Sequence, residues 1–154
     1  MIVRSVKAPR IALACLGAVL MSAPCFSQAR LDLKGLRGHV VYIDFWASWC
    51  TPCRQSFPWM KALESAYGGS GLSVVAVDLD HDRADAQRFL RVFQPNFPVV
   101  YDPAGTLAQR FNVMAMPTSV LIDRTGKIRY EHAGFLLKQR AEYERQIRDL
   151  LAQK

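Results

Sequence analysis

The chain alternates two hydrophobic patterns. Short runs that are apolar at nearly every position predict strands buried on both faces of a sheet, and longer segments with apolar residues every three or four positions predict amphipathic helices. The sequence therefore predicts strands at 40–46, 72–78 and 97–101, a hairpin of strands at 118–123 and 127–131, and helices at about 52–67, 82–93, 104–111 and 138–152. The charge-rich segment 31–38 is expected to form a lead-in strand and turn.

The order of these elements, β-α-β-α-β-α-β-β-α, predicts an α/β fold with a central mixed sheet flanked by helices on both faces. Asp82 is the expected N-cap of the second helix, and Gly126 ends the hairpin turn. No internal repeat, low-complexity tract or linker divides the sequence, so we expect a single domain from residue 30 to residue 154.

The first 29 residues have the organisation of a secretory signal peptide. Basic residues precede an apolar run of 13 residues at 11–23, and the small residues Ser27 and Ala29 occupy the −3 and −1 positions of a cleavage site. The apolar run is shorter than the roughly 20 residues that span a bilayer. We therefore expect cleavage after Ala29 and export to the periplasm.

Two alternatives to cleavage stay open. The segment could remain as an uncleaved signal anchor, or Cys15 or Cys25 could carry a lipid. The residues before each of these cysteines, at 12–14 and 22–24, do not match a lipobox, which disfavours the lipoprotein.

Removal of the signal changes both the charge and the cysteine count. The whole chain has a net charge of +7, whereas residues 30–154 keep 17 basic and 13 acidic residues, a net charge of +4. This charge is ordinary for a soluble domain, and the basic residues neither cluster nor alternate with aromatic ones, so no nucleic-acid partner is expected. Only Cys50 and Cys53 remain, and a bridge between residues so close in sequence adds little stability.

Cys50 and Cys53 lie where a buried strand meets a helix, in the stretch WASWCTPCRQSFP at 46–58. The free N–H groups and partial positive charge of a helix N-terminus favour a thiolate, so Cys50 is expected to have a lowered pKa and to attack disulfides. Pro52 suits the first helical position because it lacks an N–H. Cys53, in the first turn, is expected to point inward and to resolve mixed disulfides.

A metal clamp is the alternative use of two cysteines at this spacing. Structural metal sites need about four ligands, but His39, His81 and His132 show no ligand spacing and no second CxxC is present. The pair also differs from the CxxxC spacing of copper chaperones of the Sco type. We therefore expect neither a metal nor another cofactor.

The stretch Trp-Cys-Thr-Pro-Cys at 49–53, preceded by Asp-Phe-Trp at 44–46, resembles the active site of the thioredoxin superfamily. Pro58 matches the proline of the first long helix in that family, and Met-Pro-Thr at 116–118 resembles its cis-proline loop. The likeness extends from Leu31 to the C-terminus and implies a thioredoxin-like fold. A CxxC alone is a weak signal, but this set in this order is specific.

The segment 82–101 narrows the resemblance. Thioredoxin passes almost directly from its second strand to the short helix before the cis-proline loop, whereas this sequence predicts an extra helix and strand between them. The insertion, the predicted export and Leu-Lys-Gly at 33–35 resemble the TlpA/ResA-like exported thiol-disulfide oxidoreductases. Ser56 departs from the family's CxxCxxExP pattern, so the partner of any particular relative does not carry over.

The resemblance also implies roles around the cysteines. Asp44 is an acid inside an apolar strand, and it matches a buried Asp that assists proton transfer from the resolving thiol. We expect Asp44 to have a raised pKa and to act as the base for Cys53, the alternative being an edge or solvated position. The bond before Pro117 is expected to be cis. The implied substrate-binding residues are Trp49, Met116, Pro117 and Thr118.

The spacer between the cysteines indicates the direction of electron flow. DsbA-like pairs have a histidine there and stabilise the reduced thiolate strongly, with a cysteine pKa of about 3.5. The uncharged spacer Thr51-Pro52 predicts a less stabilised dithiol, and therefore a reductase. By resemblance, its substrates are cysteine pairs of exported proteins, either apocytochrome c or copper-site assembly proteins, and its electron donor is a membrane thiol carrier of the DsbD/CcdA type.

Two other classes of protein compete with this interpretation. One is a non-catalytic binding or metallochaperone module with the same fold. The other is a peroxidase of the peroxiredoxin type, but its Pro-x-x-x-Thr-x-x-Cys pattern is absent from the residues before Cys50.

Overall fold

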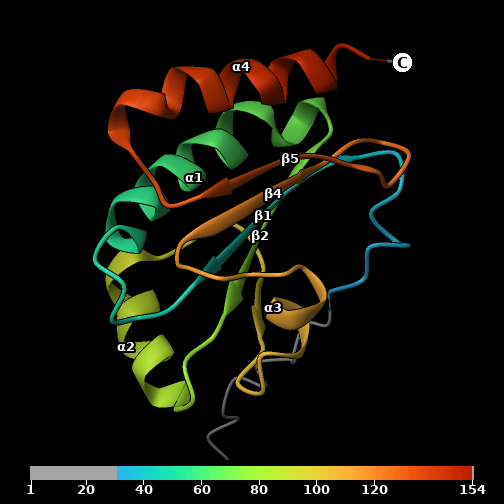
Figure 1. The fold of residues 1–154 in the computed structure, drawn as a ribbon. Helices are drawn as coiled ribbons and strands as arrows, with labels where there is room; N and C mark the ends of the chain where they lie inside the picture. Colours follow the sequence, from blue (N-terminus) through green and yellow to red (C-terminus); the bar gives the residue numbers. More distant parts are fainter. Residues whose placement is uncertain (1–30, 154) are drawn as a thin grey trace, which may run out of the picture.

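The computed structural model describes residues 31–153 (Figure 1). The predicted signal peptide at 1–29 lies outside the described residues. The elements follow one another as β1 (Val40–Trp46), α1 (Cys53–Tyr67), η1 (Gly68–Ser70), β2 (Leu72–Asp78), α2 (Arg83–Phe93), β3 (Val99–Tyr101), α3 (Thr106–Arg110), β4 (Thr118–Ile122), β5 (Ile128–Ala133), η2 (Leu137–Gln139) and α4 (Arg140–Leu151). The predicted order of strands and helices is confirmed.

The five strands form one mixed sheet in the order β3-β2-β1-β4-β5. The first three strands of the chain are parallel, β4 is antiparallel to β1, and β5 is antiparallel to β4. β1 therefore lies in the centre of the sheet, and all seven of its residues are buried. This is the predicted α/β fold, and α2 with β3 is the predicted extra helix and strand.

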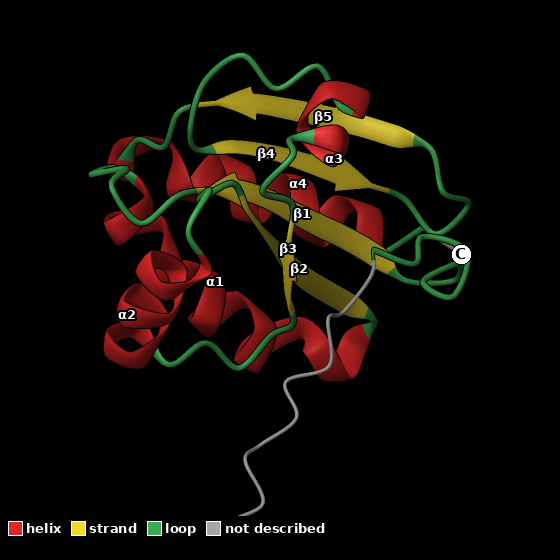
Figure 2. Cartoon of the chain, turned by 90° about the horizontal axis from the view of Figure 1, so that it is seen from below, coloured by secondary structure: helices red, strands yellow, loops and turns green. Residues whose placement is uncertain are grey.

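Helices cover both faces of the sheet (Figure 2). One face carries α1, α2 and α4, and the other carries α3 together with the segment that precedes β1. Alternate residues of a strand point to opposite faces, so Tyr42 and Trp46 join the first layer while Ile43 and Phe45 join the second. Asp44 faces the first layer, which also contains both cysteines.

An aromatic cluster ties the inserted helix α2 to α1 close to the cysteines. The ring centroid of Trp46 lies 4.7 Å from that of Phe57 in α1 and 4.6 Å from that of Phe89 in α2. Phe57 and Phe89 are themselves 4.8 Å apart. Aromatic pairs at such distances add roughly 0.5–1.5 kcal/mol each beyond the burial of their area. The insertion is therefore packed into the main core.

The segment 31–38 forms the predicted turn, but the predicted lead-in strand is wrong. The Asp32 carboxylate accepts the N–H groups of Lys34 and Gly35 at 3.1 and 3.0 Å. Such local contacts satisfy the backbone in place of a neighbouring strand. The leucines of the segment pack against the layer of α3: Leu31, Leu33 and Leu36.

Two elements are shorter than predicted. β3 begins at Val99 because Pro98 has no N–H to give to the sheet. α3 begins at Thr106, since Gly105 before it has a φ of +67° and the Asp102 carboxylate accepts the first N–H groups of the helix. The predicted cap of α2 is confirmed, as an Asp82 carboxylate oxygen accepts the N–H of the residue two positions on, Ala84, at 2.8 Å.

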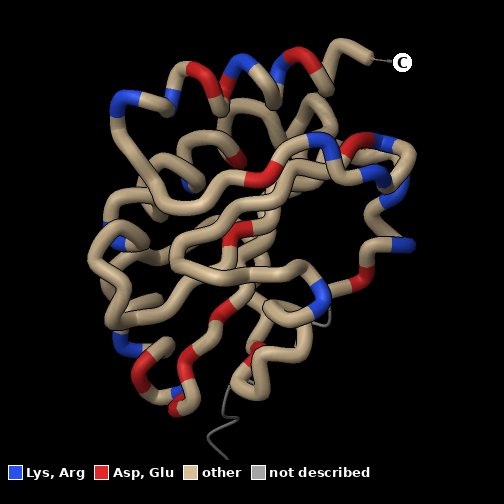
Figure 3. The backbone as a smooth tube through the Cα atoms, viewed as in Figure 1, with Lys and Arg blue, Asp and Glu red and all other residues tan. Residues whose placement is uncertain are grey.

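Charges of both signs are interspersed over the described chain, most regularly along α4 (Figure 3). Ion pairs one turn apart on this helix join Arg145 to Asp149 and Arg148 to Glu144. Exposed pairs of this kind add at most about 1 kcal/mol each. Between residues 31 and 153, no helix has the length and apolar character needed to cross a membrane.

Candidate active site

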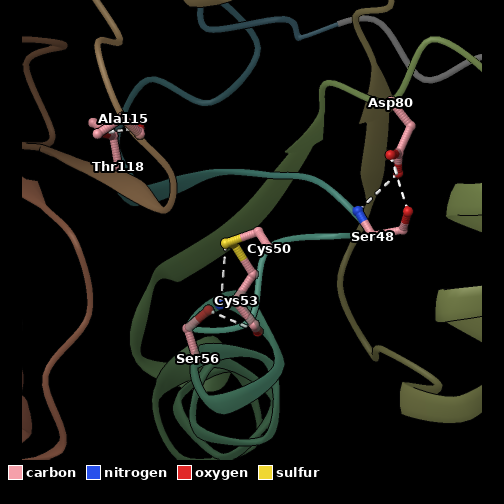
Figure 4. The surroundings of a disulfide bond; sticks show 7 residues. All are labelled: Ser48, Cys50, Cys53, Ser56, Asp80, Ala115 and Thr118. Atoms are coloured by element: carbon pink, nitrogen blue, oxygen red, sulfur yellow. Dashed lines mark hydrogen bonds between the residues drawn. A yellow bond between two sulfur atoms is a disulfide. The ribbon is translucent and has the colours of Figure 1, made fainter.

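The connection from β1 to α1 brings Cys50 and Cys53 together, and their sulfurs form a disulfide bond (Figure 4). A tight turn follows β1, because the N–H of Cys50 donates to the carbonyl of Ala47 at 3.1 Å. Cys50 is 4% exposed, whereas Cys53, the first residue of α1, is fully buried. Cys53 is therefore buried, as predicted, and Cys50 is the slightly less buried of the two cysteines.

The N-terminus of α1 faces the Cys50 sulfur. The Cys53 N–H donates to the Cys50 sulfur at 3.3 Å. Pro52 immediately precedes the helix, and no acidic residue lies in the first turn. When the disulfide is reduced, the sulfur of Cys50 has a hydrogen-bond donor and the positive end of a helix dipole in front of it, and both favour the thiolate over the thiol.

Asp44 lies in the central strand and is 1% exposed, so the alternative of an edge or solvated position is wrong. Burial raises the pKa of Asp44 well above its usual range, and the nearby Ser56 hydroxyl opposes that rise. One carboxylate oxygen, Oδ2, has no hydrogen-bond partner among the described residues. The predicted rise of the Asp44 pKa is confirmed in direction, while its role as a base stays a prediction.

Ser56 connects Asp44 to the resolving cysteine. It is fully buried in α1, and its hydroxyl donates to the carbonyl oxygen of Cys53 at 3.1 Å. The same hydroxyl is the polar side chain that opposes the rise of the Asp44 pKa. Ser56 is therefore a neutral group that bonds to the main chain of Cys53 and influences the pKa of Asp44.

The cis-proline loop lies at the same end of the sheet as the cysteines. The Met116–Pro117 bond is cis, as predicted. Phe45 pairs with Thr118 across β1 and β4, so the residues that precede β4 lie beside those that follow β1. The Thr118 hydroxyl donates to the carbonyl of Ala115 at 2.8 Å and closes the loop. Met116 packs against the core layer that holds both cysteines.

The surface around the cysteines offers apolar contacts. Trp49, next to Cys50, is 70% exposed, and Met114, just before the cis-proline loop, is 93% exposed. A hollow of about 310 Å³ lies beside the loop that carries Cys50. Its lining comes from that loop, α1 and the inserted helix α2: Ser48, Arg54, Asp85, Arg88, Phe89 and Val92.

Sequence reasoning missed a second polar group behind the cysteine loop. Asp80, which follows β2, is 4% exposed and accepts hydrogen bonds from Ser48 in the loop before Cys50 (Figure 4). Asp78, the last residue of β2, is fully buried. For Asp78 the signal was available, because it ends the apolar run at 72–78 that predicted β2, whereas Asp80 lies outside that run.

Potential metal ligands do not gather in the described part of the chain. Residues 31–153 contain no group of three or more His, Cys, Asp or Glu side chains placed to hold a metal ion. His39 instead contacts the hydroxyl of Ser73, and His132 lies between Ser119 and Gln146.

Comparisons with known proteins agree with this geometry. The Redoxin family matches residues 7–147. The thiol-disulfide oxidoreductase ResA of Bacillus thuringiensis subsp. konkukian is 33% identical over 113 residues, which cover 73% of this chain and 65% of the relative. The ResA of Geobacillus kaustophilus is 32% identical over 132 residues, which cover 81% of this chain and 75% of the relative.

Comparison with a solved structure agrees with the sequence comparisons. The crystal structure of a putative thiol:disulfide interchange protein DsbE from Chlorobium tepidum is 47% identical, with a TM-score of 0.77 over 78% of this chain and 85% of that one. The fold and the cysteine pair thus define a thioredoxin-like protein. The chain belongs to the Redoxin family, and its relatives include thiol-disulfide oxidoreductases of the ResA kind. The matched part of the chain spans less than two thirds of the length of these Bacillus relatives, 65% for the one above and 55% for the ResA of Bacillus subtilis.

Proposed function

We propose that this protein is a thiol-disulfide oxidoreductase that reduces disulfides in other proteins through Cys50 and Cys53. One observation carries the proposal: the sulfur of Cys50 faces the N-terminus of α1, while its partner Cys53 is the more deeply buried of the two cysteines. The names of the ResA and DsbE relatives support the same activity.

The reaction follows from the different positions of the two sulfurs. In the reduced protein, the Cys50 thiolate attacks one sulfur of a substrate disulfide, so that a Cys50–substrate bond forms and the first substrate thiolate leaves. Cys53 then gives its proton to the ionised form of Asp44, whose share grows as the pH rises, and the resulting thiolate attacks the Cys50 sulfur. The Cys50–Cys53 disulfide closes, the second substrate thiolate leaves, and two electrons have passed to the substrate.

Asp44 suits the role of proton acceptor because it is buried without a salt-bridge partner. An acid with a raised pKa is closer in proton affinity to a thiol, so proton transfer between them is less unfavourable than with an ordinary carboxylate. The Ser56 hydroxyl donates to the main-chain carbonyl of Cys53.

The direction of electron flow rests on the spacer. Thr51 and Pro52 add no charge near Cys50, whereas strong oxidants stabilise their thiolate so heavily that the disulfide becomes oxidising. The helix N-terminus still makes Cys50 reactive. A reactive Cys50 together with an uncharged spacer supports a dithiol that gives electrons to its substrates.

Substrates bind, in this proposal, across the surface formed by the cysteine loop and the cis-proline loop. The backbone of Met116 pairs with an extended substrate segment, Pro117 and Thr118 fix the shape of that edge, and Trp49 supplies apolar contact. The geometry that supports this arrangement is the placement of both loops at one end of the sheet.

The signal-like segment at 1–29 supports export to the periplasm. In an oxidising compartment the protein needs a source of electrons, which we propose is a membrane thiol carrier of the DsbD/CcdA type. Its proposed substrates are cysteine pairs of exported proteins, either apocytochrome c or copper-site assembly proteins.

A peptide with an oxidised Cys-x-x-Cys-His sequence, the haem-attachment motif of c-type cytochromes, tests the proposed function. The reduced protein should convert the peptide disulfide to thiols with one Cys50–Cys53 disulfide formed per peptide. The Cys50→Ser variant is the matched control and should be inactive. Equal rates for the two proteins would contradict the proposal and favour a non-catalytic module.

A further inference from the structure

Asp80 fastens the loop that carries the nucleophilic cysteine. One oxygen of its carboxylate accepts the N–H of Ser48 at 2.9 Å, and the other accepts the Ser48 hydroxyl at 3.0 Å (Figure 4). Ser48 is the second residue of the turn that the Cys50 N–H closes on Ala47. A contact between residues 32 positions apart in the sequence thus holds the turn in which Cys50 is the last residue.

We call the two hydrogen bonds from Ser48 to Asp80 the clamp. Asp78, two residues earlier in the chain, contacts Asp80. Its oxygen Oδ1 accepts the N–H of Asp80 at 3.3 Å, and acidic residues mark the whole connection from β2 to α2 (Figure 3). Asp78 is fully buried, and burial together with the neighbouring Asp80 raises its pKa to about 8. At neutral pH, Asp78 therefore keeps its proton, while Asp80 serves as the acceptor for Ser48.

Residues of both neighbouring strands flank Asp78 in the sheet. On β1 its register partner is Trp46, whose indole Nε1 has no hydrogen-bond partner among the described residues. On β3 its partner is Tyr101, whose ring lies 4.1 Å from the Arg83 guanidinium. The charged residues that share the hollow with Ser48 come from α1 and α2: Arg54, Asp85 and Arg88. Among residues 31–153, Asp80 is the charged neighbour that raises the pKa of Asp78.

We propose that Asp80 is a positioning residue for Cys50, and that Asp78, through its hydrogen bond from the Asp80 N–H, keeps Asp80 in place on Ser48. This inference rests on the proposed thiol–disulfide exchange, in which Cys50 must face the N-terminus of α1. A clamp on Ser48 holds the turn that sets this position. When Asp78 loses its proton, two buried carboxylates repel each other and the clamp loosens.

Site-specific alkylation of Cys50 tests the clamp. The full chain carries Cys53→Ser so that Cys50 stays reduced, and the rate of iodoacetamide modification is followed between pH 5 and pH 9 by mass spectrometry of the Cys50 peptide. Ser48→Ala removes one bond of the clamp without a change of charge, and Asp80→Asn removes the anionic acceptor. Both variants should lower the rate at pH 6 by about threefold or more, equivalent to about half a unit in the apparent pKa of Cys50.

The control separates positioning from general loss of stability. Asp102 is also a buried acid that follows a strand, and it accepts three N–H groups of α3 on the other face of the sheet. Asp102→Asn should lower the melting temperature and leave the alkylation rate unchanged. An equal fall in the Asp102→Asn variant would overturn the proposal. So would an unchanged or faster rate with Asp80→Asn, because loss of a nearby negative charge alone makes a thiol more acidic.

The effect of Asp78 on the clamp is tested separately by NMR. The NMR amide proton signal of Ser48 should titrate near pH 8 in the parent protein and should not titrate in the Asp78→Asn variant. No titration of that signal in the parent protein would overturn the role of Asp78. Neither measurement uses a protein substrate. Failure of the reductase proposal would appear as no reduction of the Cys-x-x-Cys-His peptide, so it is distinguishable from failure of the clamp proposal.

Discussion

The backbone N–H of Cys53 donates a hydrogen bond to the sulfur of Cys50 over 3.3 Å. This contact supports the different functions proposed for the two cysteines, because the N–H of Cys53 favours negative charge on the Cys50 sulfur while Cys53 is itself buried. A pair that served only as a structural staple would not require this asymmetry.

Loss of the resolving thiol should trap substrates. In Cys53→Ser, attack by Cys50 on a substrate disulfide produces a mixed disulfide that no neighbouring thiol can release. Non-reducing electrophoresis with mass spectrometry should detect covalent adducts on Cys50. The Cys50→Ser variant should form few or none, since its remaining sulfur is fully buried; adducts in equal yield on both variants would contradict the assigned roles.

Asp44→Asn should slow the second half of the reaction. Without a proton acceptor for Cys53, release of the substrate from the mixed disulfide should fall by about 10²-fold near neutral pH, at the low end of general acid–base contributions. The rate is measured by single-turnover quenching across pH. Asp44→Asn rates that equal those of the parent protein at every pH would remove Asp44 from the mechanism.

Asp44→Asn should also stabilise the fold as the pH rises. An unfolded Asp ionises at about pH 3.9, whereas the buried Asp44 keeps its proton to a much higher pH. Its folded-state pKa is raised, so its contribution to stability falls as the pH increases above about 4. The melting temperature of the variant relative to the parent protein should therefore rise between pH 4 and pH 7. A constant difference would mean that Asp44 is ionised in the folded protein.

Asp123 should show the opposite pH dependence. The Thr125 hydroxyl, followed by backbone N–H groups and Arg129, lowers the pKa of Asp123 to about 2. A lowered pKa stabilises the fold above the unfolded value of about 3.9, and this stabilisation is lost as the pH falls toward 2. Asp123→Asn should therefore cost about 1–3 kcal/mol at pH 7, the range for hydrogen bonds to a charged group. Thermal unfolding should show a smaller loss at pH 2.5; a loss that did not shrink would contradict the pairing.

The two tryptophans near the site should respond differently to replacement. Trp49 is 70% exposed, so Trp49→Ala should weaken substrate binding by about tenfold, the scale of an interface hot spot, with little loss of stability. Trp46 is fully buried in the aromatic cluster, and Trp46→Ala should cost about 3–5 kcal/mol of unfolding free energy. The measurements are KM for a protein disulfide and chemical denaturation. A stability loss of similar size in both variants would place Trp49 in the core instead of on the binding surface.

The sequence predicted the parts of the fold that depend on local pattern. The run Val40–Trp46 is apolar on both faces, and only a central strand satisfies that pattern, so β1 and its burial could be foreseen. Asp44 could be singled out because an acid is costly in such a run. The cis bond before Pro117 had no local signal, and it followed from the family resemblance alone.

Other features depend on contacts between distant parts of the chain. Ser48 and Asp80 are ordinary surface residue types, and their contact becomes evident only when β1 and β2 lie side by side. The lead-in segment was misassigned because the Asp32 carboxylate satisfies neighbouring N–H groups within the segment. In both cases a side-chain carboxylate replaces a backbone partner, which hydrophobic patterns do not record.

The reduction potential of the Cys50–Cys53 pair tests most directly whether the dithiol gives electrons. The purified protein is equilibrated with glutathione and dithiothreitol buffers, and the fraction of disulfide is quantified by thiol alkylation and mass spectrometry. We predict a potential closer to that of thioredoxin, about −270 mV, than to that of DsbA, about −120 mV. A potential near that of DsbA would contradict the account and make the protein an oxidant.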